Sequence, residues 1–150
     1  MRKQEKLIVY TDGGSRGNPG PAALGVVIKD AAGHIIKSYG EALGWMTNNE
    51  AEYGAVVFAL KKIRALFGKK ETKLMSVEMR LDSELVTRQL KGEYKIEEER
   101  LSHFFIKIWN LKMDFGGVSF RHVPRDENRD ADRLVNEALD KEQGGLFSNQ

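Results

Sequence analysis

Four acidic residues of the 150-residue chain lie where the surrounding pattern predicts burial or the end of a buried strand. Asp12 ends a continuous apolar run, and Asp82 ends a stretch in which apolar and polar residues alternate. Glu52 lies one turn before the apolar stripe of a predicted helix, on the side that faces the sheet. Asp132 lies at the edge of the stripe of the last predicted helix. Because an unpaired buried carboxylate is costly, these acids are candidates for chemistry.

Each acid also has an ordinary structural explanation. A strand-end aspartate such as Asp12 often begins a turn, Asp82 can cap the helix that follows it, and Asp132 can lie in solvent. Four acids at one end of a sheet would repel one another, which protonation, basic partners or a divalent cation can relieve. Oxygen ligands in a chain without cysteine favour Mg²⁺ or Mn²⁺. Two ions about 3.5–4 Å apart would suit phosphate esters, so the residues predict a magnesium-dependent phosphoryl-transfer enzyme.

Five predicted strands form the framework that positions these acids. Apolar runs or alternation mark strands at 7–11, 24–28, 34–39, 77–81 and 118–122. A glycine-rich loop is predicted over 13–21 and a hairpin turn over 30–33. The hairpin implies antiparallel neighbours and the strand–helix–strand units imply parallel ones, so we expect a mixed sheet. Sites in such α/β sheets form at the carboxyl ends of the strands.

Four predicted helices accompany the strands. Thr47 and Glu50 have the spacing of a capping box, which begins a helix carrying an apolar stripe as far as Phe67. Further helices are predicted over 83–90, 97–113 and 127–141. We interpret 1–150 as a single domain with a core over about 7–141 and a flexible tail over 142–150.

The composition excludes several classes of protein. The chain has no cysteine, so disulfide scaffolds, thiolate metal sites and cysteine nucleophiles are excluded. No apolar run approaches the roughly 20 residues of a membrane span, and the first apolar stretch is too short for a signal-peptide core. The 24 lysines and arginines against 22 acids do not by themselves favour nucleic acid. We expect a cytoplasmic protein that is monomeric and does not bind a membrane.

Four motifs in order resemble those of type 1 ribonuclease H. The first resembles the family pattern T-D-G-x…G-N-P-G, the second T-N-N-x-x-E, and the fourth N-x-x-A-D-x-L, while the third is a short strand-end motif around an aspartate. The motifs cover nearly the whole chain, at Tyr10–Pro21, Thr47–Glu52, Leu81–Ser83 and Asn128–Leu134.

This resemblance implies the ribonuclease H-like fold, a five-stranded mixed sheet flanked by helices. It implies an endonuclease that hydrolyses the RNA strand of RNA/DNA hybrids by two-metal-ion catalysis and leaves 5′-phosphate and 3′-hydroxyl ends. The metal ligands would be Asp12, Glu52, Asp82 and Asp132, holding two Mg²⁺ ions with substrate, with Mn²⁺ as a substitute. Hybrids are recognised across a shallow minor groove, and the implied contacts are Gly13, Gly14, Ser15, Asn18, Thr47, Asn48 and Asn49.

The chain departs from well-studied bacterial members of the family in several places. Their basic, tryptophan-rich handle is reduced here to a short stretch over 89–99 that is acidic at its end. We also expect that an N-terminal hybrid-binding domain is missing. Glu84 replaces a common glutamine two residues after the third-motif aspartate. The family's auxiliary histidine, which is thought to help the product leave, corresponds best to His122, with Arg125 as the alternative.

Two other functions remain open at this point. One is a non-catalytic nucleic-acid or protein-binding module on the same fold, and the complete set of four acids argues against it. The other is a related nuclease that also acts on double-stranded RNA, which the T-N-N motif does not exclude.

Overall fold

The computed structural model describes residues 5–148, with side chains described as far as residue 143. Its five strands form one sheet in the order β3-β2-β1-β4-β5. β1 pairs antiparallel with β2, which pairs antiparallel with β3, whereas β4 is parallel to both β1 and β5, so the predicted mixed sheet is confirmed. The strands are β1 (Glu5–Ser15), β2 (Gly20–Asp30), β3 (Ile35–Met46), β4 (Met75–Leu81) and β5 (Gly117–His122).

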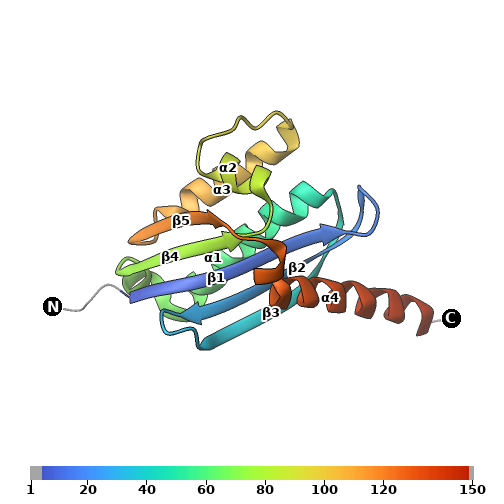
Figure 1. Ribbon diagram of the computed structural model, residues 1–150, viewed down its shortest axis with the longest axis horizontal. Helices are drawn as coiled ribbons and strands as arrows, with labels where there is room; N and C mark the ends of the chain where they lie inside the picture. The colour runs from blue at the N-terminus through green and yellow to red at the C-terminus, as the bar shows by residue number, and fades with distance from the viewer. Residues whose placement is uncertain (1–4, 149–150) are drawn as a thin grey trace.

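Helices cover both faces of the sheet (Figure 1). Three of them pack on one face, and the last crosses the opposite face over β2 and β3. The helices are α1 (Asn48–Thr72), α2 (Glu84–Leu90), α3 (Ser102–Lys112) and α4 (Arg129–Ser148), with 3₁₀ turns η1 (Glu99–Leu101) and η2 (Arg125–Glu127). Within residues 5–148, no helix combines the length and apolar character needed to cross a membrane.

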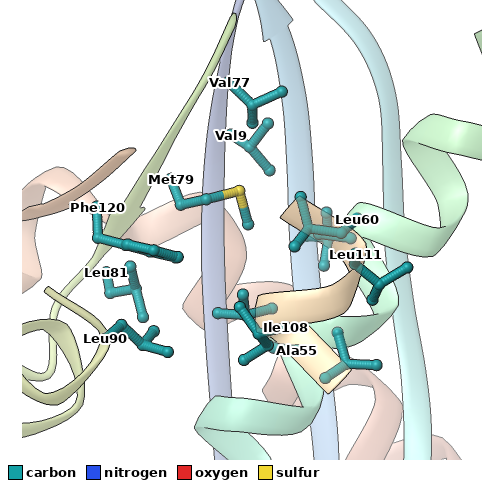
Figure 2. Close-up of a cluster of buried hydrophobic side chains, with 14 of the residues drawn as sticks. Val9, Ala55, Leu60, Val77, Met79, Leu81, Leu90, Ile108, Leu111 and Phe120 are labelled. Carbon is teal, nitrogen blue, oxygen red and sulfur yellow. The ribbon is translucent and has the colours of Figure 1, made fainter. Parts of the chain in front are cut away.

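The main core lies between the sheet and the α1–α3 face. Alternate side chains of β1 and β4, such as Val9, Val77 and Met79, point toward α1, where Leu60 meets them (Figure 2). Ile108 of α3 closes the same cluster, and all five of these side chains are buried. This packing fixes α1 against the central strands. The positions of the first two predicted metal ligands, Asp12 and Glu52, depend on it.

The order of strands and helices agrees with the prediction, but several bounds were wrong. Gly13, Gly14 and Ser15 continue β1 instead of beginning a loop, because they pair with Ala22–Leu24 of β2. The helix predicted from residue 97 begins as η1 at Glu99, and the last begins at Arg129 rather than at 127.

The far end of α4 differs from the predicted tail. The helix continues to Ser148 rather than ending at residue 141, so most of the predicted tail is helical backbone. Residues 149–150 lie outside the described residues, and the single domain with its flexible tail stays a prediction.

Candidate active site

Three of the four predicted acids meet at one end of the sheet. Asp12 comes from β1, Asp82 directly follows the neighbouring β4, and Glu52 comes from the second turn of α1. Each offers a carboxylate oxygen, and these oxygens all lie within 4.8 Å of one another. Asp12 and Glu52 are each 7% exposed, and Asp82 is half-buried. The parallel pairing of β1 with β4 runs as far as Tyr10 with Arg80, so Asp12, inside β1, and Asp82, just past the end of β4, lie at the same edge of the sheet.

A glycine explains how Glu52 reaches the strand that carries Asp12. Gly13 follows Asp12, and a Cβ placed on it would lie 2.2 Å from the carbonyl oxygen of Ala51. Only a residue without a side chain allows the backbones of β1 and α1 to approach this closely. Because Ala51 immediately precedes Glu52, the contact places the first turns of α1 directly over Asp12.

A second glycine does the same for the fourth acid. Gly25 of β2 pairs with Asp12, and its Cβ would lie 2.1 Å from the carbonyl oxygen of Ala131 in α4. Asp132, the next residue, is half-buried and lines the same cleft. Its carboxyl also raises the pKa of Asp12 through its negative charge. The helix face that docks on β2 therefore delivers Asp132 to the other three acids.

The electrostatics of the cleft call for a positive charge. Burial, with the charge of Asp82, raises the pKa of Asp12 from 3.8 to about 7. Burial, with the charge of Asp12, raises the pKa of Glu52 well above its usual range, and the Oε2 atom of Glu52 is buried without a hydrogen-bond partner. In the described part of the chain no lysine, arginine or histidine forms an ion pair with these acids. Protonation or a bound cation remains to relieve the repulsion, and the all-oxygen donor set fits a hard divalent cation.

The predicted substrate contacts gather along the same open cleft, whose volume is about 470 Å³. Asn48 accepts hydrogen bonds through Oδ1 from the backbone nitrogen and the hydroxyl of Ser15, at 2.9 and 3.1 Å. Its own backbone nitrogen donates to Oδ1 of Asn18 at 3.0 Å. The start of α1 and the β1–β2 turn are thus joined, and lining residues include Gly13, Gly14, Ser15, Asn48 and Asn49.

Thr47 has the structural role that the capping box predicts. Its hydroxyl accepts from the backbone nitrogen of Glu50 at 3.2 Å, and the Glu50 carboxylate accepts from the backbone nitrogen of Thr47 at 3.0 Å. Thr47 and Asn18 are not among the residues that line the cleft itself, so they reach a ligand only from its border.

The two auxiliary candidates line different hollows of the surface. His122 ends β5, and its Nε2 lies 3.3 Å from the backbone oxygen of Asp82, beside a hollow lined by Glu84 and Arg88. It is exposed, although it alternates along β5 with the buried Phe120. Arg125 lines the cleft that holds the acids.

A short irregular connection stands where the family's handle would be. Residues 91–98 contain no helix and join α2 to η1. Gln89 anchors this segment by donating to the backbone oxygen of Lys95 at 3.1 Å. At its end, Glu98 accepts a long hydrogen bond of 3.4 Å from the side chain of Asn49. An acidic group therefore lies beside one of the predicted substrate contacts.

Sequence reasoning gave no role to Asn128, which the structure places against the site. Its side chain is buried and donates to the backbone oxygen of Thr11 at 2.9 Å and to Oδ2 of Asp82 at 3.2 Å. The only signal in the sequence was its position at the start of the fourth motif.

Comparison with known proteins identifies the family. A family model described as "Reverse transcriptase-like" matches residues 10–138. The structure of LC11-RNase H1, isolated from compost by a metagenomic approach, has a TM-score of 0.86 and 48% identity, over 92% of this chain and 98% of that one. The chain belongs to the type 1 ribonuclease H family. The same LC11 protein in complex with RNA/DNA hybrid gives a TM-score of 0.87 at 47% identity, over 91% of this chain and 99% of that one.

Two of the curated relatives are longer than this chain. Ribonuclease HI of Halobacterium salinarum is 43% identical over 135 residues, which cover 90% of this chain but 65% of the relative. A crystal structure of the Halobacterium RNase H1 has a TM-score of 0.82 at 41% identity, over 91% of this chain and 98% of that one. A bifunctional protein of Mycobacterium tuberculosis is 35% identical over 136 residues, 90% of this chain, and this match covers 36% of its length. The chain therefore spans about two thirds of the first of these curated relatives and about a third of the second.

Proposed function

We propose that this chain hydrolyses the RNA strand of RNA/DNA hybrids and leaves 5′-phosphate and 3′-hydroxyl ends. The observation that carries the proposal is the group of three carboxylates within 4.8 Å of one another, at one edge of the sheet of a ribonuclease H fold. The likeness to LC11-RNase H1, which has been solved in complex with a hybrid, supports the choice of substrate.

We propose Mg²⁺, with Mn²⁺ as a substitute, as the cation that Asp12, Glu52, Asp82 and Asp132 hold. The raised pKa values of Asp12 and Glu52 and the unpartnered Oε2 of Glu52 support a cation at this position. Two such ions with substrate would supply charge neutralisation and activate water for attack on the phosphodiester. The protein's own contribution is geometric: strand ends and docked helices hold the four carboxylates in place.

The substrate contacts are proposed from the same cleft. Asn48 and Asn49 lie at the start of α1 beside Ser15, and all three residues line the cleft. Amides of this kind suit base edges and 2′-hydroxyl groups of a minor groove. Asn18 orients the backbone of Asn48, and Thr47 would meet a phosphate at the border of the cleft.

We assign the auxiliary role in product release to His122, with Arg125 as the alternative. His122 touches the backbone of Asp82, whereas Arg125 lines the cleft itself. A residue that helps the product leave should affect multiple turnover more than single-turnover cleavage. His122→Ala and Arg125→Ala are therefore compared in both assays, and whichever slows only multiple turnover takes the role.

A single copy of the chain supplies all four acids, which supports a monomeric enzyme. The cytoplasmic location stays a prediction.

Cleavage assays test the proposed activity directly. End-labelled RNA/DNA hybrid, with matching RNA and DNA duplexes beside it, is incubated with and without Mg²⁺. We expect magnesium-dependent cleavage of the RNA strand of the hybrid by the parent chain and none by Asp12→Asn, which keeps the shape of the side chain. Retained cleavage in Asp12→Asn would reject the site. Equal cleavage of duplex RNA would favour the broader nuclease, and binding without cleavage the non-catalytic module.

A further inference from the structure

Asn128 lies at a junction between the sheet and the last helix. It follows η2 directly, precedes α4, and is 1% exposed. Its side-chain nitrogen donates to the backbone oxygen of Thr11 at 2.9 Å and to Oδ2 of Asp82 at 3.2 Å. An asparagine amide carries two N–H donors, and both find acceptors here.

The surroundings fix the orientation of the amide. Both partners of the Asn128 nitrogen are oxygens that can only accept, so a flipped amide would turn its own oxygen against them. In the present orientation Oδ1 is buried without a hydrogen-bond partner. An unpartnered buried oxygen is destabilising, and an apolar side chain would avoid it. Filling this space therefore does not explain the presence of Asn128, and its two hydrogen-bond donors must have another role.

Three of the four acids connect to this residue. Asp82 bonds to the amide directly, and Thr11 is the residue before Asp12. The backbone oxygen of Asn128 accepts from the backbone nitrogen of Asp132 at 3.1 Å, in the first turn of α4. One side chain and its carbonyl thus join the ends of β1 and β4 to the helix that carries the fourth acid.

We propose that Asn128 is a positioning residue for the metal site and that it acts through Asp82. The amide fixes Oδ2 and so sets the rotation of the Asp82 carboxylate relative to Asp12 and Glu52. Without it the carboxylate would rotate freely, and a cation would find fewer oxygens in place. Groups that orient a metal ligand in this way are worth about 10- to 100-fold in metal affinity or activity. The inference rests on the proposed function, because it takes the acids to be magnesium ligands.

Magnesium titrations of thermal stability test the inference without relying on cleavage. Because Mg²⁺ binds only the assembled site, it stabilises the fold by RT ln(1 + [Mg²⁺]/Kd), and a fit of the melting temperature against ion concentration gives the Kd. We expect Asn128→Ala to raise this Kd at least about tenfold. Asn128→Asp, which keeps the size but replaces both donors with oxygen, should do at least as much. Asn128→Ser keeps one hydroxyl donor and should fall between parent and alanine. In cleavage assays, kcat should fall while KM for the hybrid stays within about twofold.

Ile63→Ala serves as the control for stability alone. Ile63 is buried in α1, away from the cleft lining, so its truncation should lower the melting temperature and leave the fitted Kd for Mg²⁺ unchanged. A parental Kd in Asn128→Ala would overturn the inference. So would loss of folding in all three Asn128 variants, which would assign the residue to the fold. A parent chain with neither a magnesium shift nor cleavage would instead reject the proposed function, and this inference with it.

Discussion

The environment of Asp12 and Glu52 in the folded chain favours the protonated form of their carboxyl groups. Each is almost fully buried, and their nearest charged neighbours are other acids. In the folded state the two groups hold protons that an unfolded chain would release near pH 4. The cleft is therefore strained by its own charge whenever the pH is neutral and no cation is bound.

This strain predicts a pH dependence of stability in a metal chelator. The pKa of Asp12 is raised from 3.8 to about 7, so between these values the folded state binds more protons than the unfolded state. Stability from this group is then complete below about pH 4 and is lost as the pH rises to about 7, by on the order of 4 kcal/mol. Asp12→Asn cannot titrate and should lack this component. Denaturant melts of parent and variant from pH 4 to 8 measure it, and parallel curves would contradict the prediction.

At the scale of elements, two glycines determine how closely the helices approach the sheet. Gly13 admits the backbone of α1 and Gly25 that of α4, each within a distance that a Cβ would occupy. The residues they admit, Ala51 and Ala131, directly precede Glu52 and Asp132. The same two backbone contacts therefore dock the helices on the sheet and bring Glu52 and Asp132 into the site.

A single added methyl group should therefore disturb both the fold and the site. Gly25→Ala places a Cβ 2.1 Å from the Ala131 oxygen, which forces α4 outward. Overpacking of this kind costs about 1–3 kcal/mol, and the displaced Asp132 should weaken magnesium binding. Gly117→Ala is the matched control, because no heavy atom lies within 4 Å of its Cβ. Melting curves with and without Mg²⁺ on both variants decide the matter. Equal behaviour would exclude this role for Gly25.

Local patterns in the sequence were enough to predict the strands and helices, but not the first and last residue of every one. The apolar run of β1 and the capping box of Thr47 identified their elements correctly. The strand at Gly13–Ser15 could not be predicted, because glycine favours loops locally and only pairing with β2 overrides that preference.

The same distinction holds for the site. Unusual placement in the pattern pointed to the four acids, and the resemblance assigned them as ligands. The contact of Asn128 with Asp82 joins residues far apart in the chain, and no periodicity encodes a hydrogen bond of that kind. The exposure of His122 likewise depends on how β5 ends at the edge of the sheet.

At the scale of the molecule, few features favour a long contact with a polyanion. The formal net charge is +2, and the connection over 91–98 is irregular and carries Glu93, Glu97 and Glu98, which line a separate hollow. The carboxylate of Glu98 also accepts a hydrogen bond from the side-chain amide of Asn49. Binding of a hybrid should depend on a small number of phosphate contacts around the active site.

Salt titrations of hybrid binding should reveal this small number. A plot of log affinity against log salt has a slope of about −0.9 for each phosphate neutralised, so we expect a magnitude below about 5. Insertion of a basic segment between Gly92 and Glu97 should tighten binding and steepen the slope. A neutral insertion of equal length is the control. A parent slope as steep as that of a protein with many phosphate contacts would contradict the prediction.

The acids of the cleft come from β1, α1, the end of β4 and α4, so they meet only when the sheet order and both helix layers are complete. Segments that are distant in the sequence come together late in folding, because the entropy cost of closing the loops between them precedes the stabilising contacts. Magnesium should consequently behave like an interaction absent from the folding transition state, with a φ-value near zero. Stopped-flow refolding should proceed at the same rate with or without Mg²⁺, while unfolding slows as the ion concentration rises. The ion would therefore provide kinetic stability to the native state by slowing its unfolding, and it would not accelerate folding.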